Sequence, residues 1–185
     1  ATTSTGRRIM SVFLRREYLW NETLGRERAL NITYALVLWV RDDALWFGDI
    51  WPPSKLLAEP DAETTVWSRA CRSYFGINER MVVLGRQAAG PMLSVFSSFM
   101  HGGFPDIPSA NTEAFMRAAV TTAGLRLNET EIAVLPETTA QLVGDPPELC
   151  VLEKYWCPKQ QPGKVLANLQ FCHVWAENRC HGDHS

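Results

Sequence analysis

The stretch LNITYALVLWV, residues 30–40, gives the strongest strand signal in the chain and decides the fold class. An aliphatic or Tyr side chain occupies every second position from Leu30 to Val40, while Asn31 and Trp39 fall on the alternate positions. Because successive side chains of a strand point to opposite faces, this period of two predicts a strand with one apolar face.

Segments on either side extend the pattern. The polar run RDD, residues 41–43, predicts a turn, and ALWFGDIW, residues 44–51, is predicted to pair back with residues 30–40 as a hairpin. Upstream, residues 7–19 place apolar side chains on one helical stripe, which predicts a helix that ends in the loop NETLG, residues 21–25.

The rest of the chain carries both helix and strand signals. Three further helices are expected at residues 60–76, 92–100 and 111–123, and four further strands at 80–84, 131–135, 149–155 and 165–174. We therefore predict an α+β fold with a mostly antiparallel sheet and three or four helices packed on one side or end. Residues 1–185 are expected to form a single domain, with 136–148 as the one plausible seam.

Three glycosylation sequons indicate the secretory pathway. They start at Asn21, Asn31 and Asn128, where chance predicts about one in a chain of this composition. The chain opens at Ala1 without Met, so we expect either a mature form whose signal peptide has been removed or a trimmed chain. We predict a glycoprotein that is secreted or held at the extracellular face of a membrane.

The cysteines support the same compartment. Four of the five lie close together near the C-terminus, and they are Cys150, Cys157, Cys172 and Cys180. They predict two disulfide bonds that staple the C-terminal segment, with all three pairings open. Cys71 stands apart and is either a buried free thiol or half of an intermolecular bridge.

Charge and composition argue against several classes of function. The formal net charge is −2, from 18 basic and 20 acidic residues of mixed order, so no dense positive field predicts nucleic-acid binding. The longest apolar run, residues 34–40, is far shorter than the ~20 residues of a membrane-spanning helix. We predict no cofactor, and no metal site, because the terminal cysteines beside His173 and His181 favour disulfides over zinc.

Aromatic side chains around the predicted hairpin indicate a protein-binding surface. Trp39, Trp46 and Trp51 lie on or beside it together with Arg41, and Phe104 lies in a Gly- and Pro-rich loop, residues 102–108. Trp, Tyr and Arg are enriched among the residues that anchor protein interfaces. Trp39 is either exposed on the face opposite the apolar row or buried beneath a covering element. We predict non-catalytic recognition of another protein, of the receptor, ligand or immune-modulator type.

One loop suggests an alternative. HGGFPD, residues 101–106, resembles the His-Gly-Leu-Trp-Pro signature of the T2 ribonuclease family, secreted disulfide-bonded enzymes that use histidines as acid and base. The resemblance implies a hydrolase that uses His101. Fewer than a dozen residues carry it: Gly103 departs from the Leu-Trp pair, and the second block, nearest at His173 with Glu177, lacks a second histidine. We therefore expect no enzyme, with a secreted hydrolase or a segment of a larger precursor as alternatives.

Overall fold

A computed structural model describes residues 4–42, 44–46, 49–70, 73–74, 76–104, 111–130, 135, 137–143, 148–152 and 171–172. The α-helices within those residues are α1 (Ser4–Leu30), α2 (Pro53–Leu57), α3 (Arg86–Leu93), α4 (Val95–Met100) and α5 (Thr112–Thr122), and a short 3-10 turn, η1, spans Ala62–Thr64. The strands are β1 (Leu36–Val40), β2 (Ala44–Trp46), β3 (Thr65–Arg69), β4 (Met81–Gly85), β5 (Arg126–Thr130), β6 (Glu137–Val143), β7 (Glu148–Leu152) and β8 (Phe171–Cys172).

The strands form two mixed sheets. The first has the order β1-β4-β3-β5, in which β4 is antiparallel to both neighbours and β5 is parallel to β3. The second has the order β2-β6-β7-β8, in which β7 and β8 are parallel. The α+β class is confirmed, but the sheets are mixed and the described helices number five. The chain returns from β4 through α3, α4 and α5, and this crossover lays β5 parallel to β3.

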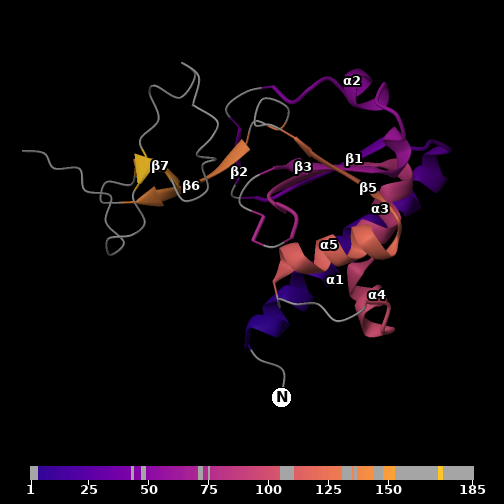
Figure 1. Ribbon diagram of the computed structural model, residues 1–185, viewed down its shortest axis with the longest axis horizontal. Coiled ribbons are helices and arrows are strands. Elements are labelled where there is room, and N and C mark those ends of the chain that lie inside the picture. Colours follow the sequence, from indigo (N-terminus) through magenta and orange to yellow (C-terminus); the bar gives the residue numbers. More distant parts are fainter. Residues whose placement is uncertain are drawn as a thin grey trace, which may run out of the picture.

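Helices cover one face of the first sheet, and α2 lies over the other (Figure 1). We call these the helix face and the far face. On the helix face, Val66, Val82 and Leu84 pack among side chains of α1, α3 and α5. On the far face, the core consists of Leu56, Ala62, Trp67, Met81, Val83 and Leu135.

The first helix is longer than the sequence predicted. Buried side chains recur along α1 at the helical spacing of three, four or seven residues, at Phe13, Arg16, Trp20 and Glu27. The buried face of the helix therefore continues beyond the expected loop at residues 21–25. Two of those positions are charged, which hides the stripe from an apolar pattern. The helix ends where the amides of Asn31 and Ile32 donate to the carbonyls of Arg28 and Glu27, at 3.3 and 3.1 Å. Asn31 adopts a φ of 52°, the left-handed cap conformation that suits Gly or Asn.

The predicted hairpin is wrong. Strand β1 starts only at Leu36, because residues 30–31 form the end of α1. The strand pairs with β4 and not with residues 44–46. Strand β2 pairs with β6 in the other sheet, Trp46 opposite Glu137.

The predicted helix over residues 60–76 is also wrong. Asp61, expected as its cap, has a φ of 58°, and η1 leads directly into β3. The run Thr65-Val-Trp67 is rich in β-branched and aromatic side chains, and it pairs with β4 and β5. The expected helix over 92–100 is two helices that meet at Ser94. Cys71 lies outside the described residues.

Other elements agree with the sequence. Asn111 caps α5, its Oδ1 accepting the amide of Ala114 at 2.7 Å, and β4 matches the expected strand over 80–84. Strands β7 and β8 fall within the expected 149–155 and 165–174, apart from Glu148 at the start of β7. Strand β5 comes earlier than the expected 131–135, of which only 135 is described, and β6 occupies most of the suggested seam.

Gly76 marks a close approach between the loop before β4 and the start of α5. The Ile77 amide donates to the Glu113 carbonyl at 3.1 Å, and a Cβ on Gly76 would overlap the backbone of Glu113 and Ala114.

We expect Gly76→Ala to lower the free energy of unfolding by about 1–3 kcal/mol through this overlap. Gly25→Ala, in the open interior of α1, is the matched control and should raise it by about 0.5–1 kcal/mol. Urea unfolding of both variants measures the pair, and equal effects would contradict the prediction.

Candidate functional site

Three large apolar side chains and one arginine are accessible to solvent in the segment that runs from β1 to the start of α2, and we call these four residues the surface set. Leu38, Trp46 and Trp51 are 45, 39 and 37% exposed, and the side chain of Arg41 is 38% exposed. Three of the four were predicted from the sequence to bind a partner, namely Arg41, Trp46 and Trp51. Leu38 belongs to the apolar row that was expected to face the core, so its exposure could not be read from the alternation.

The neighbours of Trp51 fix its position. Ile50, on one side, packs against the far-face core, and Leu56 on the other belongs to it. The Lys55 ammonium lies 5.2 Å from the centre of the Trp51 ring, a cation–π distance. The backbone at Trp51 is therefore anchored from both sides while the ring itself is accessible.

Trp39, which was predicted to bind, lies half-buried in the helix-face core. Its indole Nε1 donates to the backbone carbonyl of Glu79 at 3.2 Å, and the Arg16 guanidinium carbon lies 4.2 Å from its ring centre. The ring is therefore neither fully exposed nor fully buried, the two alternatives that the sequence left open. The ring supports packing rather than the surface set.

The guanidinium of Arg16 is the centre of a buried charged cluster. Arg16 is 2% exposed, pairs with the carboxylate of Glu79, and contacts the sulfur of Met116 at 3.1 Å. Burial lowers the pKa of Arg16, and the charge of Glu79 opposes that shift. Arg41 reaches the same carboxylate from the surface, Nη1 to Oε1 3.8 Å, so the surface set connects directly to this cluster.

Phe104 and His101 lie beside the helices rather than near the surface set. The Phe104 ring is half-buried and meets Phe115 edge-on, 6.4 Å between ring centres. His101 is exposed just after α4, with its Nδ1 2.7 Å from the Ser97 carbonyl oxygen. The second block of the ribonuclease resemblance, residues 173–180, lies outside the described residues, so the structure places only the His101 part of it.

The three sequons differ in their surroundings. Asn21 is exposed on α1, and Asn31 is exposed just after it. Asn128 is half-buried on β5, and its Nδ2, the atom that would carry a sugar, donates to Glu59 Oε2 at 2.8 Å. The indole nitrogen of Trp67 donates to the same oxygen at 3.1 Å.

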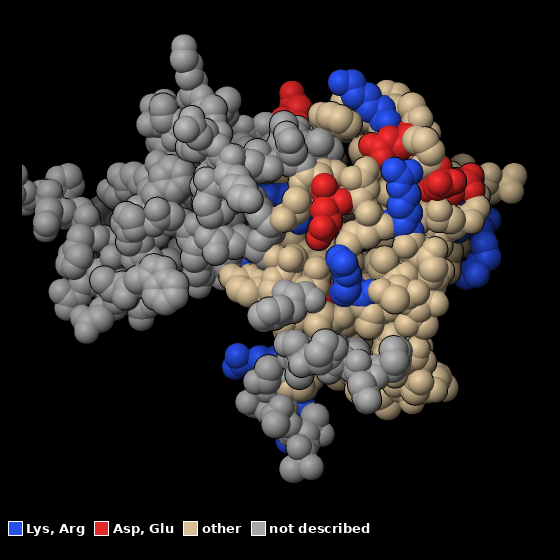
Figure 2. Space-filling model, viewed as in Figure 1, with Lys and Arg blue, Asp and Glu red and all other residues tan. Residues whose placement is uncertain are grey.

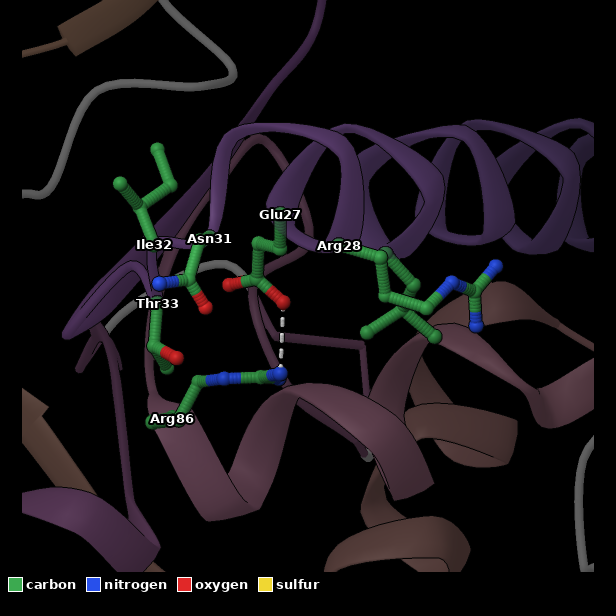
Figure 3. A pocket seen from close by; sticks show the side chains of 7 residues that line it. Glu27, Arg28, Asn31, Ile32, Thr33 and Arg86 are labelled. Carbon is green, nitrogen blue, oxygen red and sulfur yellow. Dashed lines mark hydrogen bonds and ion pairs between the residues drawn. The ribbon is translucent and has the colours of Figure 1, made fainter.

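A pocket of about 380 Å³ opens beside Asn31, and no pattern in the sequence other than the sequon pointed to it. Its lining residues are Leu24, Glu27, Arg28, Asn31, Ile32, Thr33 and Arg86. Glu27 accepts from Arg86 Nη2 at 2.7 Å (Figure 3). It also accepts from the Tyr34 amide at 2.8 Å. The guanidinium, amide and hydroxyl groups of the wall suit a ligand rich in oxygen atoms.

The predicted disulfide staple falls largely outside what the structure describes. Cys157 and Cys180 lie outside the described residues, as does the side-chain packing of Cys150 in β7 and Cys172 in β8. Cys172 pairs in register with Leu152, two positions from Cys150 along β7. The bonding of these cysteines stays a prediction. Among the described residues no group of His, Cys, Asp or Glu is arranged to hold a metal ion.

Comparisons with known proteins add no assignment. No protein-family model matches the chain, and searches of curated proteins and of solved structures gave no significant match.

Within the described part of the chain, no helix has the length and apolar character needed to cross a membrane. On the described surface seen in Figure 2, basic and acidic side chains are interspersed rather than separated into one-sign patches.

Trp39 and Trp51 should respond differently to truncation. Trp39→Ala removes a ring packed on Arg16 and the core, so we expect its free energy of unfolding to fall by about 3 kcal/mol. Trp51→Ala removes an accessible ring and should change it by less than about 1 kcal/mol. Urea unfolding followed by circular dichroism measures both, and equal destabilisation would show that Trp51 is a packing residue too.

Glu113 gives a prediction about pH. Burial, the largest effect, raises the pKa of this carboxyl, and the nearby charge of Glu79 adds to the shift. A carboxyl with a raised pKa in the folded state stabilises the fold fully below its unfolded-state pKa. That contribution is lost as the pH rises through the folded-state pKa.

We therefore expect Glu113→Gln to gain stability relative to the natural chain as the pH rises from about 4 to 7. Urea unfolding at a series of pH values measures this difference. A difference that stays constant or reverses over that range would contradict the prediction.

Proposed function

We propose that this chain acts by non-catalytic recognition of another protein, as a secreted glycoprotein or a cell-surface ectodomain. The observation that carries the proposal is the surface set: Leu38, Trp46 and Trp51 expose large apolar side chains along one short stretch, with Arg41 among them. Exposed apolar groups that the core does not use are typical of partner sites, and Trp and Arg are typical anchors.

The anchoring of these residues supports tight binding. Binding costs free energy when side chains and loops become ordered, and this cost is small where the backbone is already fixed. Leu38 lies within a paired strand, and Trp51 follows Ile50, which packs against the far-face core, and precedes Leu56, which belongs to it. Arg41 contacts Glu79, which is itself held by Arg16. A partner would therefore meet side chains that are largely preorganised.

The compartment is part of the proposal. Asn21 and Asn31 present exposed sequons, and the clustered cysteines fit an oxidising environment. A receptor, a ligand and an immune modulator would all work there, and each would use an apolar and aromatic contact surface that includes a basic side chain.

The test starts with a pull-down from cell-surface and serum proteins read by mass spectrometry, followed by a binding assay with the captured partner. Trp46→Ala and Trp51→Ala should each weaken binding about tenfold, since anchors of this type commonly contribute 1–2 kcal/mol or more. Leu14→Ala and Tyr18→Ala are the matched controls, because these residues of α1 are 50 and 62% exposed but lie outside the surface set. Loss of affinity in the controls alone would move the contact to α1 and refute the proposal.

A second assay addresses the hydrolase alternative, which the fixed and exposed imidazole of His101 favours. General acid–base catalysis first requires an oriented group within reach of substrate. Cleavage of single-stranded RNA by the natural chain that disappears in His101→Ala would replace recognition with catalysis as the function. Equal inactivity of both proteins supports the recognition proposal.

A further inference from the structure

We propose that the pocket between α1 and α3 seats the first N-acetylglucosamine of a glycan attached to Asn31. This inference rests on the secretory setting of the proposed function and assigns a specific role to one of its sequons. The sugar would serve as a fixed part of the fold rather than as a freely moving surface group.

Position is the first argument. Asn31 both lines the pocket and belongs to the sequon, and Thr33 of the same sequon lines it too. The helix end fixes the backbone there, because the amides of Asn31 and Ile32 donate to carbonyls of the last turn of α1. A sugar attached to Asn31 therefore starts at the pocket rim from a fixed backbone position, which reduces the entropy lost when it settles on the wall.

The chemistry of the wall is the second argument. The sugar ring and its acetamide group are rich in hydroxyl and carbonyl oxygens, and Arg86 and Arg28 supply multiple N–H donors. The oxygens of Glu27 already accept from Arg86 and from the Tyr34 amide, so the buried carboxylate is compensated. Leu24 and Ile32 offer apolar surface to the acetamide methyl group.

The shape agrees with a single sugar. A volume of about 380 Å³ is near the lower end of the range for ligand sites, which suits one ring rather than an extended chain. Figure 3 shows Asn31 and Thr33 on one side of the Glu27–Arg86 pair and Arg28 on the other. The outer sugars would leave towards solvent along the open side.

The other sequons lack this arrangement. Asn21 is exposed on the middle of α1 and does not line this pocket. Asn128 directs its Nδ2 to Glu59 and lies half-buried on β5. Asn21 is therefore the natural control for a glycan that has no seat.

The experiment uses the full chain secreted from cultured cells and trimmed enzymatically so that one N-acetylglucosamine remains at each site. Amide hydrogen exchange over residues 24–34 should be about tenfold slower than in the Asn31→Gly variant, which loses the sugar but keeps the left-handed cap. Thr33→Ser retains the sequon and should retain the protection. Asn21→Gln should leave exchange over residues 24–34 unchanged.

Two further measurements separate a seated sugar from a general effect of glycosylation. Nuclear Overhauser contacts between the acetamide methyl group and the methyl groups of Leu24 or Ile32 are expected. Arg28→Ala should reduce the protection in the trimmed protein and leave the unglycosylated chain, made in bacteria, unchanged. The proposal would be refuted if Asn31 carries the sugar but shows no such contacts and exchanges over residues 24–34 as fast as the Asn31→Gly variant.

Partner binding, measured on the same preparations, keeps the two proposals apart. If the exchange and Overhauser measurements show no bound sugar while binding to the captured partner is intact, this inference alone is refuted. Secreted protein without sugar at any sequon refutes the inference and removes the glycoprotein part of the proposed function as well.

Discussion

The buried ion pair between Arg16 and Glu79 is the interaction on which the arrangement of the first sheet depends. It joins the middle of α1 to the residues that lead into β4, and the Arg16 guanidinium also stacks on Trp39 of β1. Burying two charges is costly, and removing either partner alone leaves an uncompensated charge that commonly costs about 3–5 kcal/mol. The pair therefore permits one placement of α1 over the sheet and penalises others.

A second pair works in the same way at the end of the helix. Glu27 joins the last turn of α1 to Arg86 at the start of α3, and it also holds the amide of Tyr34 as the chain turns towards β1. Arg86 in turn lies over the ring of Trp20 at 5.0 Å. With both pairs formed, the entry into β1 and its position beside β4 are fixed, and so is the pocket beside Asn31.

The fixed orientation of β1 explains why Leu38 belongs to the surface set. Neighbouring residues of a strand point to opposite faces, so a one-residue shift of register would exchange every side chain between them. Because Trp39 is held inward by Arg16 and by its hydrogen bond to the Glu79 carbonyl, Leu38 must point to the far face. The exposure of Leu38 at the sheet edge follows from this parity, and the interaction that stabilises the core also creates part of the proposed contact surface.

The sequence predicted correctly those elements whose formation depends on residues close together along the chain. The cap at Asn111 and the apolar run of β4 are properties of adjacent residues, and both were recovered. The full length of α1 was not, because Arg16 and Glu27 occupy core positions that an apolar pattern excludes. Pairing of β1 with β4 depends on contacts some 45 residues apart along the chain, and the apolar alternation of residues 30–40 fits a hairpin equally well. The pocket was missed because it brings Arg86 to the end of a distant helix.

The pocket beside Asn31 lies before the start of β1, whereas three residues of the surface set follow its end and Leu38 is its central residue. In the order of the described strands β1 is at a sheet edge, and such an edge is a template for unwanted pairing with other chains. A glycan seated at Asn31 would cover the approach to the first residues of that edge, whereas Arg41 and Trp46 lie beyond its last residue. The sugar would then protect the edge without obstructing the partner. On this view the glycan would cover the start of the edge, and the residues that follow its end, Arg41 and Trp46, would stay accessible to a partner.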